Sequence, residues 1–266
     1  MCIRDRPGTG SLASLGEYGT GRLPEPPELL AAFEAALSAG RELDGLNVLV
    51  TAGGTREPID SVRFVGNRSS GRMGFAVAEE AARRGADVTV VAANVALARR
   101  SGIEYLDVQT AAELAAACEE RFGAADVLVM AAAVADYRPE AAHEGKLKKD
   151  ETGSELTLRL VRTTDVLATL SARRRPGQLL VGFAAEHGEG AIAYGRDKLA
   201  RKDLDAVVVN DVGRPGIGFD AAQNEVTIIT QDNEKHVPRA SKAEVATAIL
   251  DAVLSRRSSS DMKVPR

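Results

Sequence analysis

The stretch Leu46-Asn47-Val48-Leu49-Val50-Thr51-Ala52-Gly53-Gly54-Thr55 decides the fold class. Its apolar, β-branched half predicts a short buried strand over Leu46–Thr51, and the glycine pair ends that strand. In a parallel sheet, ligands bind at the carboxyl ends of the strands, where backbone N–H groups are free. Gly53 and Gly54 are therefore candidate ligand-binding residues.

Strand and helix patterns alternate along the chain on the carboxyl side of this stretch. Together they predict a Rossmann-like, doubly wound, mostly parallel α/β sheet with helices on both faces and a C-terminal β-hairpin. A polar loop is expected over 135–153. The expected strands are Leu46–Thr51, Asp87–Ala92, Ile103–Val108, Asp126–Val134, Glu155–Val161, Gln178–Ala184 and Asp205–Asn210; the helices are Ser70–Arg84, Thr110–Phe122, Thr164–Arg174, Glu189–Lys202 and Ser241–Leu254; the hairpin strands are Val226–Thr230 and Lys235–Val237.

The two ends of the chain carry weaker patterns. Residues 1–22 are rich in Gly and Ser and have no periodicity, whereas Glu28–Leu37 has the spacing of a short amphipathic helix. The tail Ser255–Arg266 is expected to be disordered. We therefore expect one main domain over 45–255, preceded by a linker segment over 1–44 and followed by a disordered tail over 256–266.

Composition excludes several classes of protein. The 266 residues include 34 Lys and Arg against 38 Asp and Glu, a net charge of −4, which argues against a nucleic-acid-binding protein. Two cysteines and three dispersed histidines offer no metal motif, so no metal-ligating residues are expected. The longest apolar run, Val127–Ala135, is too short to span a membrane. A cytoplasmic protein without membrane contact is expected.

The loop after the first strand departs from the dinucleotide fingerprint, because the helical pattern begins only near Ser70. This loop still carries anion-binding chemistry. Arg63 and Asn67 are spaced to clamp a phosphate or carboxylate, and Ser69, Ser70 and Gly71 precede a helix N-terminus. The alternative is a polar surface loop with a helix cap.

Further candidates follow later strands. Small residues after Met130, namely Ala131 and Ala132, would let a flat ligand approach the backbone, and Asp136 would accept hydrogen bonds from it; packing beneath a helix is the alternative. Lys146 lies in a lysine cluster suited to a polyphosphate, in a loop that we expect to be mobile until nucleotide binds. Lys198 and Lys202 share a helix face. Ordinary surface charge is the alternative for these lysines.

Tyr194 and Lys198 also have the YxxxK spacing of short-chain dehydrogenases. The glycine fingerprint of those enzymes does not follow the first strand, and the nearest upstream serine is the distant Ser171. An NAD(P)-dependent oxidoreductase therefore remains a minor alternative.

Several of these strings, in this order, resemble one family. The chain is similar over about residues 45–255 to the phosphopantothenate–cysteine ligase half of the bifunctional coenzyme A biosynthesis flavoprotein. The strings that carry the resemblance are Thr51–Asp60, Val62–Gly74, Ala131–Arg138, Lys146–Lys149, Val181–Glu186 and Asn210-Asp211.

The resemblance implies a two-step reaction. The carboxylate of 4′-phosphopantothenate attacks the α-phosphate of CTP, and the amine of L-cysteine then displaces CMP from the acyl-cytidylate. The resemblance favours CTP over ATP, Mg²⁺ carried by the nucleotide phosphates, and a homodimer. It places Asn67, Arg63 and Lys146 in catalysis. It implies nucleotide contacts at Met130, Ala131, Ala132, Asp136, Thr164, Asp165, Val166, Leu167, Phe183, Lys198 and Lys202, and substrate contacts at Arg63, Asn67, Ala132 and Asn210.

The segment Gly19–Pro26 resembles the end of the decarboxylase domain to which this ligase is fused in the family. The family's catalytic cysteine precedes that string, whereas Ala13-Ser14-Leu15 stands there in this chain. The resemblance therefore implies neither FMN binding nor decarboxylation by this chain. A catalytically idle nucleotide-binding module remains a further alternative.

Overall fold

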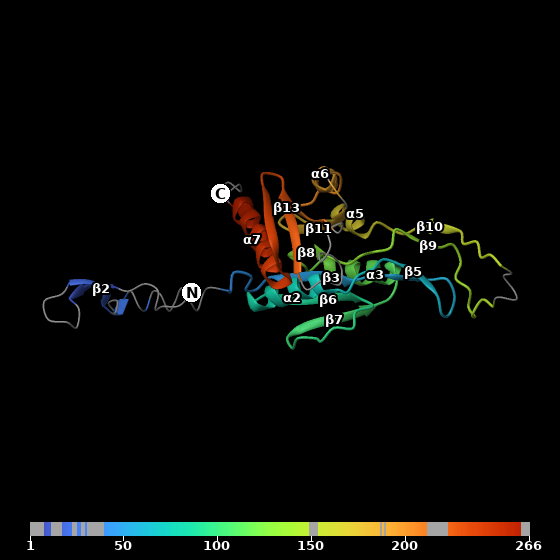
Figure 1. Cartoon of the computed structure of the whole chain (residues 1–266), viewed down its shortest axis with the longest axis horizontal. Helices are drawn as coiled ribbons and strands as arrows, with labels where there is room; N and C mark the ends of the chain where they lie inside the picture. The colour runs from blue at the N-terminus through green and yellow to red at the C-terminus, as the bar shows by residue number, and fades with distance from the viewer. Residues whose placement is uncertain are drawn as a thin grey trace.

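A computed structural model describes residues 8–11, 18–22, 26–27, 30, 40–148, 154–186, 188, 190–211 and 223–261 of the chain. Its centre is an eight-stranded sheet with the order β14-β13-β12-β11-β8-β3-β6-β7 (Figure 1). The strands are β3 (Asn47–Gly53), β6 (Asp87–Ala93), β7 (Ile103–Val108), β8 (Val127–Met130), β11 (Leu179–Glu186), β12 (Ala206–Asp211), β13 (Gln223–Thr230) and β14 (Glu234–Ser241).

Six of these strands are parallel, and their order is that of a doubly wound dinucleotide-type fold. β3 is the first strand of this sheet along the chain. The chain continues outward from it through β6 and β7 and then returns to β8 on the other side of β3. The hairpin of β13 and β14 then adds two antiparallel strands beside β12. The predicted fold class is confirmed.

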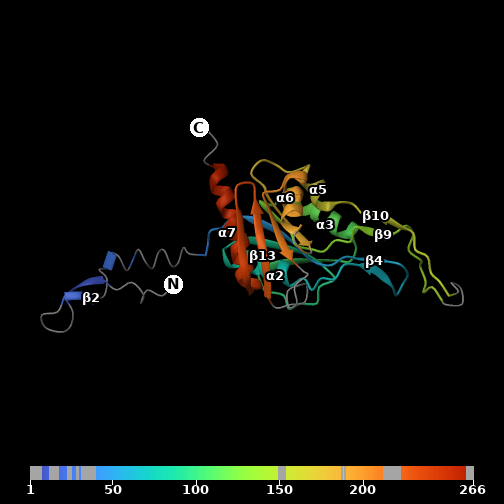
Figure 2. The same ribbon diagram turned by 45° about the horizontal axis from the view of Figure 1, so that its top comes forward.

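Helices cover both faces of the sheet (Figure 2). α2 (Arg72–Arg83) and α7 (Lys242–Asp261) pack on one face, whereas α3 (Ala111–Phe122), α5 (Val166–Ser171) and α6 (Ala191–Arg201) pack on the other. Val48 and Val50 of β3 enter the first core and Leu49 enters the second, because successive side chains of a strand point to opposite faces. The continuous apolar run that predicted β3 is thus buried on both sides.

A small hairpin precedes α2 and leads away from the carboxyl end of β3. It consists of β4 (Arg56–Pro58) and β5 (Phe64–Gly66), joined antiparallel. The buried Glu57 carboxylate accepts the Ala111 N–H at 2.8 Å, at the start of α3. Thr110 caps the same helix by accepting the Glu113 N–H at 3.2 Å, as its position in the sequence predicts. The hairpin is therefore anchored to the main body.

The structure corrects the expected course of residues 126–162. The expected strand Asp126–Val134 ends at Met130, and the region taken as a loop over 135–153 contains β9 (Tyr137–Pro139). Of the expected strand Glu155–Val161, only its end belongs to β10 (Leu160–Arg162), which pairs antiparallel with β9. A strand of three residues is too short to show a periodic pattern that distinguishes it from a loop. Such strands form only because two distant segments pair with each other.

Both ends also differ from expectation. α7 continues to Asp261, so the predicted disordered tail is wrong over 255–261; Arg256 in this part forms an ion pair with Asp232. Two short strands, β1 (Gly8–Ser11) and β2 (Tyr18–Arg22), pair antiparallel in a region for which the sequence predicted no structure. Most of the expected helix Glu28–Leu37 lies outside the described residues.

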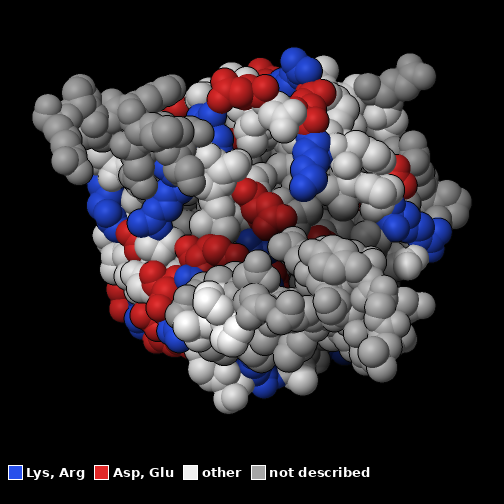
Figure 3. Space-filling model, turned by 90° about the vertical axis from the view of Figure 1, so that its left-hand side faces the viewer, with Lys and Arg blue, Asp and Glu red and all other residues white. Residues whose placement is uncertain are grey.

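Within the described part of the chain, no helix is long and apolar enough to cross a membrane. The face of the molecule shown in Figure 3 carries acidic and basic side chains close together. This mixture of signs agrees with the near-balance of charges in the sequence.

Candidate active site

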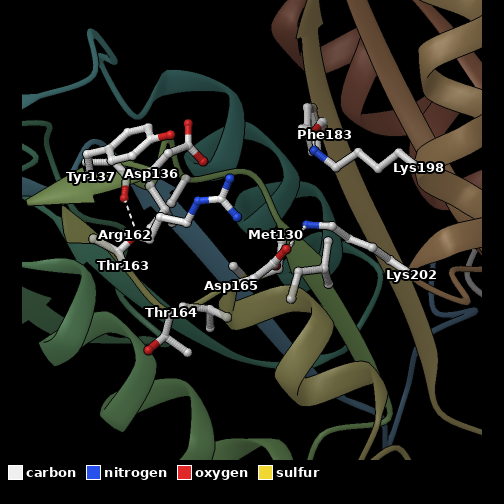
Figure 4. A pocket seen from close by; sticks show the side chains of 15 residues that line it. Met130, Asp136, Tyr137, Arg162, Thr163, Thr164, Asp165, Phe183, Lys198 and Lys202 are labelled. Carbon is white, nitrogen blue, oxygen red and sulfur yellow. Dashed lines mark hydrogen bonds and ion pairs between the residues drawn. The ribbon is translucent and has the colours of Figure 1, made fainter. Parts of the chain in front are cut away.

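A pocket of about 530 Å³ opens at the carboxyl edge of β8 and β11 (Figure 4). This is the edge at which doubly wound sheets bind ligands, one strand from the point where the strand order reverses. Its volume is in the usual range for small-molecule sites. The lining residues are Met130, Ala132, Val134, Ala135, Asp136, Tyr137, Arg162, Thr163, Thr164, Asp165, Val166, Leu167, Phe183, Lys198 and Lys202.

Threonines hold the segment after β8 that forms one wall. The Thr51 hydroxyl accepts the Ala132 N–H at 3.1 Å, and the buried Thr55 hydroxyl accepts the Ala135 N–H at 2.9 Å. From the other side, the Thr163 hydroxyl donates to the Ala135 carbonyl at 2.6 Å, and its N–H donates to the Asp136 carbonyl at 3.0 Å. The wall is therefore fixed by Thr51 of β3, by Thr55 in the loop that follows it and by Thr163, the residue directly after β10.

Lys198 supplies a desolvated positive charge to the pocket. Its Nζ donates to the Phe183 carbonyl at 2.6 Å, and among the described residues it forms no ion pair. Burial lowers the pKa of Lys198, repulsion by Lys202 lowers it further, and nearby carboxylates only partly offset these effects. A desolvated cation with no ion-pair partner among the described residues favours the binding of an anionic ligand.

Lys202 is the C-cap residue of α6, four positions after Lys198, and its charge is neutralised by a carboxylate. Its Nζ is 2.7 Å from Asp165 Oδ2, and Asp165 also accepts the Ala168 N–H at 3.1 Å as the cap of α5. Burial acts to raise the pKa of Asp165, but the Lys202 and Ala168 hydrogen bonds outweigh it and lower that pKa. Arg162 brings a third cationic side chain from β10, on the side of the pocket opposite Lys198 in Figure 4.

Many of the predicted nucleotide contacts lie together in this pocket. They come from four separate stretches of sequence, and are Met130, Ala132, Asp136, Thr164, Asp165, Val166, Leu167, Phe183, Lys198 and Lys202. The pocket is also lined by residues that the sequence did not indicate, namely Val134, Ala135, Tyr137, Arg162 and Thr163. Ala135, Tyr137 and Thr163 each adjoin a predicted residue directly. Arg162 enters the pocket because β9 pairs with β10, and no local pattern predicted that pairing.

The glycine loop after β3 lies outside this pocket. Gly53 has a φ of +87°, and a Cβ there would lie 2.0 Å from the Ala93 carbonyl oxygen. Gly71 has a φ of +75° before α2, where a Cβ would lie 2.7 Å from the Val95 side chain. These glycines permit close packing. Like them, Gly54, Ser69, Ser70 and Ala131 are not among the lining residues.

The remaining predicted site residues lie beside the pocket or away from it. Asn67 is exposed after β5, and its Nδ2 donates to the carbonyl of the lining residue Val134 at 3.0 Å. Asn210 is the penultimate residue of β12, and its buried Oδ1 has no hydrogen-bond partner among the described residues. Arg63 and Lys146 are not among the lining residues, and the Arg63 guanidinium pairs with Asp60 at 2.8 Å.

The first part of the loop that was expected to be mobile is held by hydrogen bonds up to Leu147. The Ile59 carbonyl accepts the His143 N–H at 2.9 Å, and Asp60 Oδ2 accepts the Leu147 N–H at 3.2 Å. The part over 149–153 lies outside the described residues.

Within the described residues, no group of three or more His, Cys, Asp or Glu side chains is arranged to hold a metal ion. The two pocket carboxylates are Asp136 and Asp165, and the second already binds Lys202. These residues fit a divalent ion that arrives with a phosphate ligand better than one held by protein alone.

The fold and this pocket define a Rossmann-like α/β protein with a charged, ligand-sized site at the carboxyl edge of its sheet. Comparison with known proteins makes the assignment specific. The family described as "DNA/pantothenate metabolism flavoprotein C-terminal domain" matches residues 43–256, and the chain belongs to this family.

Curated relatives include the coenzyme A biosynthesis bifunctional protein CoaBC of Mycobacterium bovis, 44% identical over 263 residues, and that of Bacillus subtilis, 42% identical over 251 residues. The alignments cover 94% and 93% of this chain but only 62% and 61% of those proteins. A crystal structure of the C-terminal domain of CoaBC superposes with a TM-score of 0.70 at 35% identity, covering 82% of this chain and 99% of that one. The resemblance found in the sequence is therefore confirmed.

Proposed function

We propose that the chain ligates 4′-phosphopantothenate to L-cysteine at the expense of CTP, through an acyl-cytidylate, in coenzyme A biosynthesis. The observation that carries the proposal is the juxtaposition of the desolvated Lys198 with Lys202 and Arg162 in one pocket at the carboxyl edge of the sheet. Membership of the family supports the choice of reaction.

The pocket has the two kinds of surface that a nucleotide needs. Apolar side chains of Met130, Val134, Leu167 and Phe183 would receive the base, and the three cations would receive the phosphates, with Mg²⁺ carried by the phosphates. Acyl-nucleotide formation depends mainly on positioning and charge stabilisation, so such a site needs no protein nucleophile. Lys146, from outside the pocket, would add charge stabilisation.

Asn67 is proposed to act in the second step. Its amide lies against the pocket wall at Val134 and follows the hairpin that approaches that wall. In this position it would orient the acyl-cytidylate for attack by the cysteine amine. We also propose that the chain forms a homodimer. In the bifunctional relatives, we propose that the second function belongs to a decarboxylase domain fused to this one.

The test is incubation with 4′-phosphopantothenate, L-cysteine, Mg²⁺ and either CTP or ATP. We expect CMP, pyrophosphate and the amide product in equal amounts, with CTP preferred. AMP formation at an equal rate would remove the CTP assignment. Absence of any nucleotide cleavage would favour the idle nucleotide-binding module.

The oxidoreductase alternative receives no support from the site. Tyr194 is exposed on α6 and does not line the pocket, whereas Lys198 is bound to the Phe183 carbonyl. The two side chains of the YxxxK spacing are therefore not joined in one catalytic pair. Oxidation of NAD(P)H or reduction of NAD(P)+ by the purified chain would revive this alternative.

A further inference from the structure

The turn between β4 and β5 contains a buried carboxylate with an unusual number of donors. The Asp60 side chain has no exposed surface. Its Oδ1 accepts the N–H groups of Val62 at 2.8 Å and Arg63 at 2.7 Å, while Oδ2 lies 2.8 Å from the Arg63 guanidinium and accepts the Leu147 N–H at 3.2 Å. Two of these contacts shape the turn itself, and the one to Leu147 joins it to a segment 87 positions away.

Leu147 is held by both of its backbone polar groups. Asp60 takes its N–H, and the Arg63 guanidinium donates to its carbonyl oxygen. Leu147 is the residue between Lys146 and Lys148, and both of these lysines are exposed. A contact that fixes the backbone on each side of Leu147 also fixes where the Lys146 side chain begins.

Two further backbone contacts extend this attachment. The Ile59 carbonyl accepts the His143 N–H at 2.9 Å, and the Gly145 carbonyl accepts the Ser61 N–H at 3.5 Å. The segment 143–147 therefore follows the turn over 59–63. The same hairpin leads to Asn67, which contacts the pocket wall at Val134. One small hairpin thus connects the Lys146 segment to the pocket.

We propose that Asp60 is a positioning residue that, together with Arg63, clamps Leu147 and thereby places Lys146 for the reaction. The placement of Lys146 rests on contacts within this chain, whereas its use in the reaction rests on the proposed function. In this proposal Arg63 acts by holding Leu147 and does not bind the substrate directly. The cations of the pocket bind the substrate instead.

The electrostatics of Asp60 agree with a clamp that stays charged. Burial acts to raise the pKa of Asp60, but the N–H groups of Arg63, Val62 and Leu147 and the Arg63 charge outweigh it and bring the pKa to about 2. The carboxylate can therefore accept all its hydrogen bonds at neutral pH. An amide in its place can accept at only one of its two terminal atoms.

The first experiment measures trypsin cleavage of the Lys146–Leu147 bond in Asp60→Asn without any ligand. Loss of the clamp is expected to speed cleavage of this bond by about tenfold, because local opening exposes it. The matched control is Asp126→Asn. Asp126 also accepts a backbone N–H, that of Asn47 at 3.0 Å, and contacts an arginine, Arg175, at 3.1 Å, but lies just before β8 at the opposite edge of the sheet.

Cleavage that is unchanged in Asp60→Asn, or equally fast in Asp126→Asn, would overturn the clamp. Arg63→Lys provides a second variant should Asp60→Asn fail to fold. It keeps the charge but loses the planar group that reaches both Asp60 and the Leu147 carbonyl, so it should also speed cleavage.

The second experiment is a double-mutant cycle on kcat for CMP formation with Asp60→Asn and Lys146→Gln. If Asp60 acts through Lys146, adding Asp60→Asn to Lys146→Gln will change kcat less than about twofold, although Asp60→Asn alone lowers it about tenfold. Fully additive losses would assign Asp60 a general structural role and overturn the positioning proposal. If the wild-type chain forms no CMP, the proposed function fails, and the trypsin experiment alone decides the clamp.

Discussion

Lys198 and Lys202 show how residues of one type differ in the same pocket. Lys198 lies in the last turn of α6 and Lys202 is the C-cap residue of that helix, four positions further along. The structure gives Lys202 the Asp165 carboxylate, whereas Lys198 is desolvated with only the Phe183 carbonyl as its hydrogen-bond acceptor in the described part of the chain. A bound phosphate would therefore gain the most binding free energy from contact with Lys198.

Replacing these lysines one at a time separates their roles. We expect both Lys198→Met and Lys202→Met to weaken CTP binding by about 10–100-fold, since a hydrogen bond to a charged group contributes about 1.5–3 kcal/mol. Their effects on the unliganded protein should differ. Lys202→Met should lower the melting temperature slightly, because its pair with the half-exposed Asp165 contributes less than about 1 kcal/mol.

Lys198→Met should keep or raise the melting temperature, because it removes a desolvated charge. Calorimetric binding and thermal melting test both statements. A large loss of stability in Lys198→Met would mean that its bond to Phe183 outweighs the cost of burying the charge.

Asn67→Ala is expected to leave acyl-cytidylate formation within about threefold of wild type and to slow the step with cysteine by about 10²-fold, the scale of one lost contact to a developing charge. Mass spectrometry of the quenched reaction should detect the accumulated intermediate. Asn233→Ala, an exposed asparagine in the turn before β14, is the control. Normal turnover in Asn67→Ala would reduce this residue to a loop contact with Val134.

At the scale of elements, α2 and α7 are joined by a charged network on the face opposite the pocket. Arg84, only 5% exposed, is bound by Glu80 of α2 at 2.8 Å and by Asp251 of α7 at 2.8 Å, and also donates to the Thr247 carbonyl at 3.3 Å. Thr247 in turn donates to Glu80 at 3.2 Å. Because the Arg84 guanidinium is buried, its partners are required to offset the free-energy cost of removing its charge from water.

Glu80→Gln is expected to lower the free energy of unfolding by about 1–3 kcal/mol at pH 7, because a buried donor loses its charged acceptor. The hydrogen bond from Arg83 is the largest effect on the pKa of Glu80; burial opposes it, Arg84 reinforces it, and the pKa falls from 4.5 to about 2. A depressed pKa stabilises the protein fully above pH 4.5 and loses that effect as the pH falls toward 2.

The difference between wild type and Glu80→Gln should therefore shrink across this pH range in denaturant titrations. Glu79→Gln, at the neighbouring position of α2, is the control and should be neutral. A difference that is constant from pH 7 to pH 2 would show that packing, and not the charge of Glu80, is responsible.

On the scale of the whole molecule, the N-terminal strands are separate from the main domain. β1 and β2 pair with each other, and Figures 1 and 2 show them away from the eight-stranded sheet. The family match begins at residue 43, shortly before β3. The core of the sheet is thus built from residues that follow this boundary.

Deletion of residues 1–39 should therefore change the melting temperature by less than about 2 °C, which for a chain of this size corresponds to less than about 1 kcal/mol. CMP formation should also persist, and neither form should bind FMN. Thermal melting, the nucleotide assay and the visible absorption spectrum check these outcomes. A drop of 10 °C, or a yellow protein, would assign the N-terminal segment a role in the fold or in flavin binding.

The sequence by itself determined the layers of the fold. Apolar runs such as Val48–Val50 specify strands buried on both faces, and helical periodicity specifies what covers them, because burial and secondary structure share one pattern. It also determined much of the pocket, since residues after parallel strands must meet at one edge of the sheet. Met130 was predictable for this reason, whereas Asp165 was indicated by the family resemblance and Lys198 by its helical spacing from Lys202 together with that resemblance.

Only the tertiary structure decided the pairings between distant short segments. β9 and β10 are too short to carry periodicity, so the entry of Arg162 into the pocket depends on their pairing. Likewise, no spacing indicates that Asp60 and Arg63 bind the backbone of Leu147, or that Gly53 meets the Ala93 carbonyl. Backbone groups are the same at every residue, and their partners are therefore chosen by the fold and not by the local sequence.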